Sequence, residues 1–123
     1  MPVPQKKINN LKISIILPNY NSLKYIDATI KSVINQSFKN WELIIIDDCS
    51  DEKTKKILSK YLKNKKIKII WLKKNRGTGY CRNLAIKKSK SKYLAFIDSD
   101  DLWEKNKLKI QLEYMVKNNY SFT

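Results

Sequence analysis

The chain has 123 residues, of which 42% are hydrophobic and 30% are charged, and its formal net charge is +15 at pH 7. This length corresponds to one domain or part of one and is sufficient to bury a hydrophobic core. No apolar run approaches the roughly 18–20 residues that a membrane-spanning helix needs. Because there is no histidine and there are only two cysteines, the chain lacks the side chains for a His-based triad or a Cys/His zinc site.

Short apolar strands and helices alternate along the chain after a flexible basic lead at residues 1–10. Strands are expected at 12–17, 41–46, 67–72 and 93–97, with the start of a fifth at 120–123. Pro18 should end the first strand, because proline cannot donate to a strand ladder. Asp51 is a plausible N-cap for the second helix. Apolar residues at helical spacing mark four helices: Ile26, Ile30, Val33 and Ile34; Ile57, Leu58, Tyr61 and Leu62; Tyr80, Leu84 and Ala85; Trp103, Leu108, Leu112 and Met115.

This alternation predicts an α/β fold for residues 11–123, with three layers and a mostly parallel sheet covered by helices. In such sheets ligands bind outside the carboxyl ends of the strands, where the strand order reverses. We therefore examined the residues that follow each strand.

Polar and aromatic residues follow all four predicted strands. The first strand runs into Pro18, Asn19, Tyr20 and Asn21, and the second into the aspartate pair Asp47 and Asp48. Arg76 follows the third strand. Asp98, Ser99, Asp100 and Asp101 follow the fourth. These side chains should converge on one edge of the sheet.

The carboxylates predict a site for a divalent cation and a nucleoside diphosphate. Residues i and i+2 of an extended chain project on the same side, so Asp98 and Asp100 can face one ligand. Mg²⁺ is commonly held by one or two carboxylates together with substrate phosphates. Tyr20 can lie against a base, and Arg76 or Arg82 can contact phosphate. The alternative for the acidic stretch is a turn, with Asp100 or Asp101 capping the next helix.

Four segments, in order and with fitting spacing, resemble glycosyltransferase family 2 of the GT-A fold. The resemblance covers about residues 11 to 118 and is carried by Ser14–Asn21, by Gln36–Asp51, by Asn75–Gly77 with Arg82–Ile86, and by Phe96–Asp101, which matches an Asp-x-Asp metal motif. It implies a Rossmann-like nucleotide-binding half of such a domain.

The resemblance implies inverting transfer of a sugar from a nucleotide-sugar, with UDP as the expected nucleotide, to an acceptor hydroxyl. Pro18, Tyr20 and Asp48 would line the nucleoside pocket. Asp98 and Asp100 would hold ribose, diphosphate and Mg²⁺ or Mn²⁺. Donor-side candidates also include Asn21, Arg76, Arg82 and Ser99, while Asp47 is expected to hold the loop rather than the donor. Sugar or lipid-linked acceptors in polysaccharide or glycolipid synthesis are the expected partners.

The chain departs from the family pattern at two cysteines and at its end. Cys49 stands where glycine is frequent, and Cys81 where a small residue is usual. The family's general base lies in a later part of the domain, so we expect it beyond Thr123. The domain should be incomplete at its C-terminus and this chain by itself inactive. An exposed sheet edge would favour a homo-oligomer.

The basic charge leaves one alternative function, a nucleic-acid- or membrane-binding module without catalysis. Of the 26 basic residues only Arg76 and Arg82 are arginine, the side chain that most often reads bases, so no nucleic acid is expected. Lysines do fit peripheral contact with an anionic membrane. With no signal peptide at residues 1–10 and no disulfide framework, we expect a cytoplasmic protein. Peripheral attachment to the inner face of the cytoplasmic membrane is compatible with this expectation.

Overall fold

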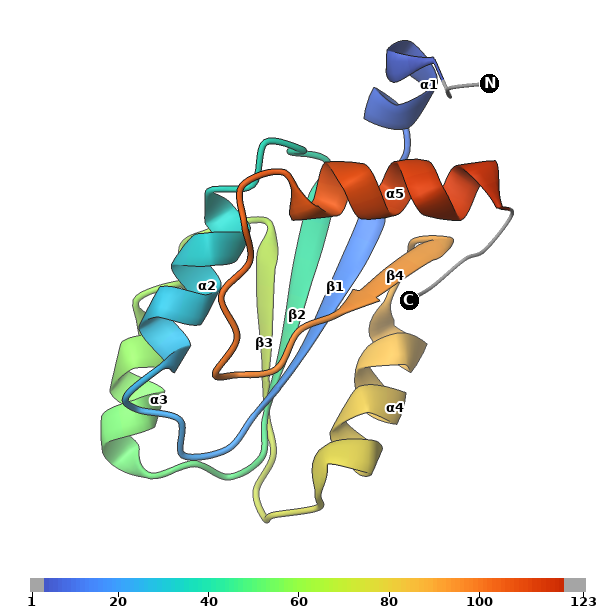
Figure 1. The fold of residues 1–123 in the computed structure, drawn as a ribbon. Coiled ribbons are helices and arrows are strands. Elements are labelled where there is room, and N and C mark those ends of the chain that lie inside the picture. The colour runs from blue at the N-terminus through green and yellow to red at the C-terminus, as the bar shows by residue number, and fades with distance from the viewer. Residues whose placement is uncertain (1–3, 119–123) are drawn as a thin grey trace.

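The computed structural model describes residues 4–118, and the fifth strand expected at 120–123 lies outside them. Figure 1 shows helices and strands alternating along the chain. The helices are α1 (Gln5–Asn9), α2 (Ile26–Ile34), α3 (Glu52–Ser59), α4 (Thr78–Lys88) and α5 (Lys107–Lys117). The strands are β1 (Ile13–Asn19), β2 (Trp41–Asp47), β3 (Ile67–Trp71) and β4 (Tyr93–Phe96). The predicted α/β class is confirmed.

The four strands form one parallel sheet in the order β3-β2-β1-β4. The chain adds strands in one direction from β1 to β3, then crosses to the other side of β1 to form β4. The strand order therefore reverses between β1 and β4, which is where an open α/β sheet binds ligands.

The expected stop of the first strand at Pro18 is wrong, because β1 continues to Asn19 with Pro18 opposite Ile46. The Ile16 carbonyl accepts from Ile97 N–H on the β4 side, whereas the Asn19 carbonyl accepts from Asp48 N–H on the β2 side. Since a parallel strand directs alternate residues to opposite neighbours, Pro18 turns its nitrogen toward β4. Pairing with β4 has already ended there, so no ladder bond is lost.

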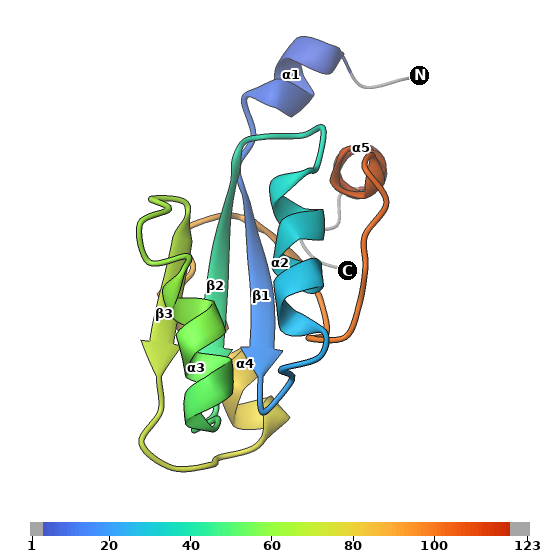
Figure 2. The same ribbon diagram turned by 90° about the vertical axis from the view of Figure 1, so that its left-hand side faces the viewer.

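Two apolar clusters lie on opposite faces of the sheet. The larger joins α1, α2, α3 and α5 to one face, and the smaller joins α4 alone to the other. Figure 2 shows α2 and α5 together on one side of the strands. Central strand β2 is buried along its whole length, as a strand covered on both faces should be. The three-layer arrangement follows.

Three local expectations differ from the structure. Within the lead at residues 1–10, α1 is helical and its Ile8 is fully buried in the larger cluster. Tyr80 was expected on the inner face of its helix, but Cys81 and Ala85 occupy that face and Tyr80 is exposed. Trp103 is buried in the loop before α5 rather than inside a helix.

The described helices include none that is both long and apolar enough to cross a bilayer.

Candidate functional site

A pocket of about 200 Å³ opens at the carboxyl ends of β1 and β4, beside the start of α4. Its lining comes from four segments of the chain: Pro18, Asn19, Tyr20, Asp48, Thr78, Cys81, Asp98 and Ser99. The pocket forms because the pairing of β1 with β4 ends at Ile16 and Phe96, and the two strands separate beyond these residues. Pro18 extends β1 alongside β2 past this point, and the space left on the other side is open to a ligand.

Asp47 and Asp48, at the end of β2, have different structural roles. Asp47 is fully buried, and its carboxylate accepts from Asn19 Nδ2 at 3.1 Å and from Ser50 N–H at 3.1 Å. Asp47 therefore connects the end of β1 to the loop after β2, as the sequence analysis expected of this residue. Its side chain does not line the pocket.

Asp48 lines the pocket and also fixes the loop before α4. Its Oδ1 accepts from Arg76 N–H at 2.7 Å and its Oδ2 from Gly77 N–H at 2.9 Å. The side chain is nearly buried, so these two bonds compensate its desolvation. Each carboxylate oxygen retains a further lone pair for a donor group on a ligand.

Helix α4 begins at the pocket. Gly77 precedes it with φ +91°, a left-handed conformation that glycine adopts without steric cost. Thr78 and Cys81 then face the pocket from the first turn. Burial raises the pKa of the Cys81 thiol to about 11, and the nearby Asp48 carboxylate adds to this rise. Cys81 is therefore a neutral wall of the pocket rather than a nucleophile.

Asn19 lines the pocket, although the sequence placed it only at the end of the first strand and not among the donor-binding residues. It is almost completely buried, and its Nδ2 donates to Asp47 and, at 3.4 Å, to Ser50 Oγ. Its Oδ1 has no hydrogen-bond partner among the described residues. A buried acceptor without a partner is costly, and a donor group on a bound ligand would relieve that cost.

The β4 end contributes Asp98 and Ser99 to the pocket. Asp98 Oδ1 is 3.2 Å from Arg82 Nη2, and both side chains are largely exposed. The Ser99 Oγ lies 2.6 Å from Ser22 Oγ, and the Ser99 carbonyl accepts from Thr29 Oγ1 at 2.9 Å. These bonds join the loop after β4 to the β1–α2 connection, through Ser22, and to α2, through Thr29.

Asp98 and Asp100 could supply two carboxylates to a divalent cation, with Asp100 exposed and outside the pocket lining. In the part of the chain that the structure describes, no three Asp, Glu, Cys or His side chains gather as a complete metal site. The donor set fits a cation that takes its remaining ligands from phosphate and water, which is usual for Mg²⁺.

Three other predicted site residues lie outside the pocket lining. Asn21 has φ +49° and joins two loops, since its N–H donates to Ser50 Oγ and its Oδ1 accepts from Asp51 N–H. The Arg76 guanidinium stacks over the Tyr80 ring at 4.4 Å from its centroid. Arg82 reaches Asp98 from the second turn of α4.

Comparison with known proteins decides the family. The model of the family described as "Glycosyl transferase family 2" matches residues 14–123. The chain belongs to glycosyltransferase family 2. All four segments that suggested this family from the sequence lie within or immediately beside the elements that form the pocket.

Among curated relatives of this glycosyltransferase domain, the putative teichuronic acid biosynthesis glycosyltransferase TuaG of Bacillus subtilis is 43% identical over 112 residues. That alignment spans 90% of this chain and 44% of TuaG. The UDP-Glc:alpha-D-GlcNAc-diphosphoundecaprenol beta-1,3-glucosyltransferase WfgD of Escherichia coli is 41% identical over 89% of this chain and 43% of its own length. The chain thus spans less than half the length of these relatives.

Solved structures confirm the GT-A fold. The crystal structure of Staphylococcus aureus TarS 1–349 in complex with UDP matches with a TM-score of 0.79 and 34% identity, over 89% of this chain and 33% of that one. The mannosyltransferase PcManGT of Pyrobaculum calidifontis, in complex with GDP-Man and Mn²⁺, has the same TM-score at 16% identity. At that identity the likeness shows a shared fold alone.

The pocket lining contains five of the nine predicted donor-binding residues, namely Pro18, Tyr20, Asp48, Asp98 and Ser99. Asn19, Thr78 and Cys81 also line the pocket but are not among the donor-binding residues predicted from the sequence. Thr78 and Cys81 are spaced three apart at the start of a helix that follows a strand, and this spacing places them on one helical face pointing at the strand ends. That signal was available in the sequence.

Proposed function

We propose that this domain binds the nucleoside diphosphate part of a nucleotide-sugar, with UDP as the nucleotide, in the pocket between β1 and β4. The observation that carries the proposal is the meeting of Tyr20, Asp48 and Asp98 around one pocket at the point where the strand order reverses. The 34% identical TarS structure contains UDP, and another TarS structure, 35% identical, contains UDP-GlcNAc. Both support a uridine nucleotide as the ligand here.

The pocket residues divide between the two ends of such a ligand. Tyr20 is about half exposed, so its ring is available to stack on a base. Asp48 and the unpartnered Oδ1 of Asn19 are acceptors for base or ribose N–H and O–H groups. Asp98 and Asp100, with Arg82 beside them, mark the diphosphate end.

We assign Asp98 and Asp100 as the residues that would hold Mg²⁺ or Mn²⁺. Such a cation neutralises the charge that develops on a departing diphosphate. Arg82 holds Asp98 in place, and its charge offsets part of the repulsion between neighbouring carboxylates. The metal-ligand role rests on the chemistry of the two carboxylates and on their place at the end of β4.

The reaction that we propose for the whole enzyme is inverting transfer of the sugar to an acceptor hydroxyl in the synthesis of a cell-surface polysaccharide or glycolipid. The acceptor and the general base are expected from parts of the protein outside this chain. Of the proteins that this chain resembles, TuaG is named for teichuronic acid biosynthesis and WfgD for glucosyl transfer to GlcNAc-diphosphoundecaprenol. A cytoplasmic domain near the membrane would meet nucleotide-sugars and lipid-linked acceptors together.

Isothermal titration with UDP, UDP-glucose, UDP-GlcNAc and GDP, each with and without Mn²⁺, tests the proposal. We expect uridine nucleotides to bind, and Mn²⁺ to strengthen their binding by at least tenfold. Binding is the appropriate readout because the chain spans less than half of its relatives. Folded protein that binds none of these nucleotides would refute the proposed function.

A further inference from the structure

The carboxylates of this chain are segregated from a long basic stretch. Residues 53–97 contain fourteen lysines and two arginines but no aspartate or glutamate. All eleven carboxylate side chains lie at residues 27–52 and 98–113. A general preference for lysine would raise the number of cations but would not remove the acids from 45 consecutive residues.

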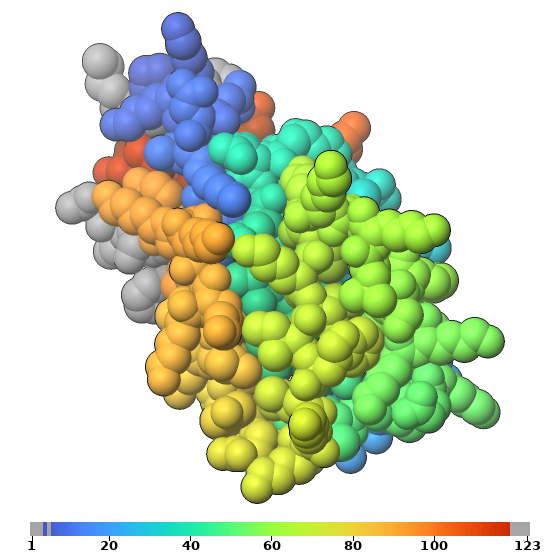
Figure 3. Space-filling view, turned by 180° about the vertical axis from the view of Figure 1, so that it is seen from behind, coloured from blue at the N-terminus to red at the C-terminus, as the bar shows by residue number. Residues whose placement is uncertain are grey.

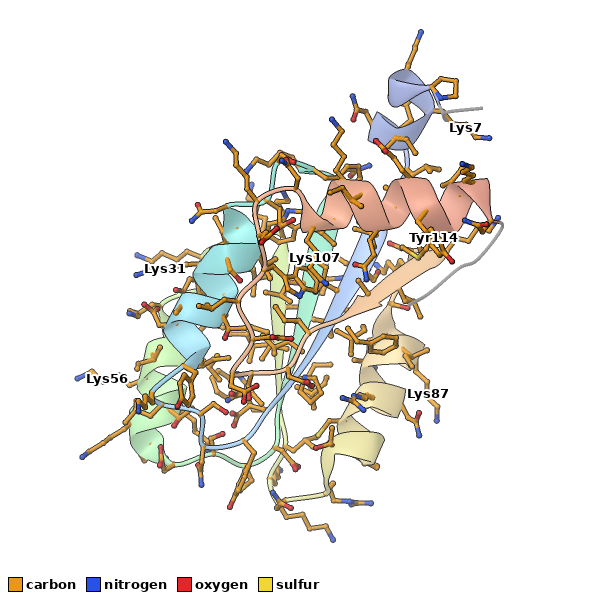
Figure 4. The ribbon with its side chains drawn as sticks, in the orientation of Figure 1. Lys7, Lys31, Lys56, Lys87, Lys107 and Tyr114 are labelled. Carbon is orange, nitrogen blue, oxygen red and sulfur yellow. The ribbon has the colours of Figure 1, made fainter. Side chains whose placement is uncertain are left out.

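Most of this stretch forms one side of the molecule. Residues 65–97 make β3, α4 and β4, which account for much of the surface seen in Figure 3, in yellow and orange. We call this side the basic face, defined by residues 65–97. Lys87 on α4 projects outward from its helix (Figure 4). Helix α3 packs with α2 and α5 on the opposite face of the sheet from α4.

Few cations of the basic face are neutralised within the domain. Salt bridges engage Lys68 with Glu42 and Arg82 with Asp98. The remaining cations of the basic face have no carboxylate within 4.0 Å among residues 4–118. Unbalanced like charges destabilise the folded chain, so an external anion is the natural counterpart of this face.

Exposed apolar side chains are interspersed with the lysines. Tyr80 is 42% exposed, Ile86 38% and Trp71 37%. Nine of the eleven cations of the basic face are lysines, whereas arginine is the side chain that most often reads nucleic-acid bases. Lysines with exposed tryptophan, tyrosine and isoleucine are typical of a surface that lies on anionic lipid headgroups.

We propose that the basic face binds the surface of an anionic lipid bilayer. Trp71 ends β3 at the same edge of the sheet as Asp47, its register partner, so the face reaches the rim that carries the pocket. Tyr80 lies in the first turn of α4, beside Thr78 and Cys81 of that pocket. Docking through this face places the pocket close to the headgroup region.

The test is binding to vesicles of phosphatidylcholine containing 30 mol% phosphatidylglycerol, measured by co-sedimentation at low and high salt. One triple variant, K65E/K73E/K87E, alters the basic face. A control triple, K105E/K107E/K117E, introduces the same change of net charge around α5. Each lysine near an anionic surface contributes about fivefold to the partition coefficient, so the first triple should weaken binding by about 100-fold. The control triple should stay within threefold of the unaltered chain.

Thermal unfolding of both triples checks that they remain folded, and K65Q/K73Q/K87Q replaces the first triple if it does not. An equal loss of vesicle binding in the two triple variants would overturn the proposal, because it would show only the effect of net charge. No binding of the unaltered chain to these vesicles would also overturn it. So would tighter binding to single-stranded RNA than to vesicles at the same salt concentration. UDP titrations of the same variants separate this result from the proposed function, since none of the six lysines lines the pocket.

Discussion

Asp48 Oδ2 accepts a hydrogen bond from Gly77 N–H at 2.9 Å, so the end of β2 fixes the residue from which α4 starts. The other oxygen of the same carboxylate holds Arg76 N–H. One side chain therefore shapes the wall of the pocket and also lines it. Loss of Asp48 should affect both the stability of the fold and the binding of a ligand.

Asp48→Ala should lower the free energy of unfolding by about 2–3 kcal/mol, because two backbone N–H groups lose a charged acceptor. Asp51→Ala is the matched comparison. Asp51 caps α3 by accepting from Thr54 N–H at 2.9 Å, and its loss should cost only about 1 kcal/mol. Urea unfolding monitored by circular dichroism measures both values. If Asp48→Ala costs no more than Asp51→Ala, the supporting role of Asp48 is wrong.

Gly77→Ala should destabilise the fold by about 1–2 kcal/mol although no atom lies within 4 Å of the added Cβ. The cost comes from the backbone alone, because φ at Gly77 is +91°. Gly79→Ala adds the same methyl group inside α4, also in open space, and should stabilise by roughly 0.5–1 kcal/mol. In thermal unfolding, the melting temperature should fall for Gly77→Ala and rise for Gly79→Ala. A change of the same sign in both variants would contradict this prediction.

Asp27 should make stability depend on pH in the acid range. Hydrogen bonds from Lys31 and Tyr61 lower the pKa of its carboxyl from 3.8 to about 2, with Lys60 adding to the shift. Because the folded pKa lies below the unfolded one, this stabilisation is complete above about pH 4 and is lost as the pH falls through about 2. After allowance for solvent screening it amounts to about 1–2 kcal/mol.

The measurement is the difference in unfolding free energy between the unaltered chain and Asp27→Asn, followed from pH 6 to pH 2. The difference should shrink as the pH falls. Tyr61→Phe, which removes the hydroxyl that donates to Asp27 at 2.5 Å, should reduce the pH dependence without abolishing it. A difference that stays constant with pH would show that folding does not lower the pKa of Asp27.

The sequence was sufficient to predict the sheet and the position of the pocket, because strand periodicity and strand-end residues depend on local sequence. It could not show that β1 continues through Pro18, since this depends on where pairing with β4 stops. Nor could it show that Asn21 forms hydrogen bonds with Ser50 and Asp51, because these bonds join residues about 30 positions apart.

Cys49 shows where resemblance and geometry agree. Its φ of +65° lies in the left-handed region, which explains why glycine would suit this position. The Cys49 thiol donates to the Lys73 carbonyl at 3.4 Å, and its side chain does not line the pocket.

Asp98→Asn and Asp100→Asn should each abolish most of the strengthening of UDP binding by Mn²⁺, because each removes a charged oxygen ligand. Asp101→Asn is the control, since Asp101 is the third carboxylate of this stretch, is not assigned to the metal site, and closes a turn through its N–H on the Asp98 carbonyl. Titrations with and without Mn²⁺ give the ratio of the two dissociation constants for UDP directly. An unchanged ratio in both Asp98→Asn and Asp100→Asn would remove these residues from the metal site.

The central claim, that the pocket between β1 and β4 is the nucleotide site, is tested most directly by titrating UDP into the ¹⁵N-labelled chain and following backbone amide shifts by NMR. The largest shifts are predicted at Tyr20, Thr78, Cys81 and Ser99, which come from three separate segments and meet only at this pocket. Shifts concentrated around α5, or no shifts at UDP concentrations well above the millimolar range, would contradict the account.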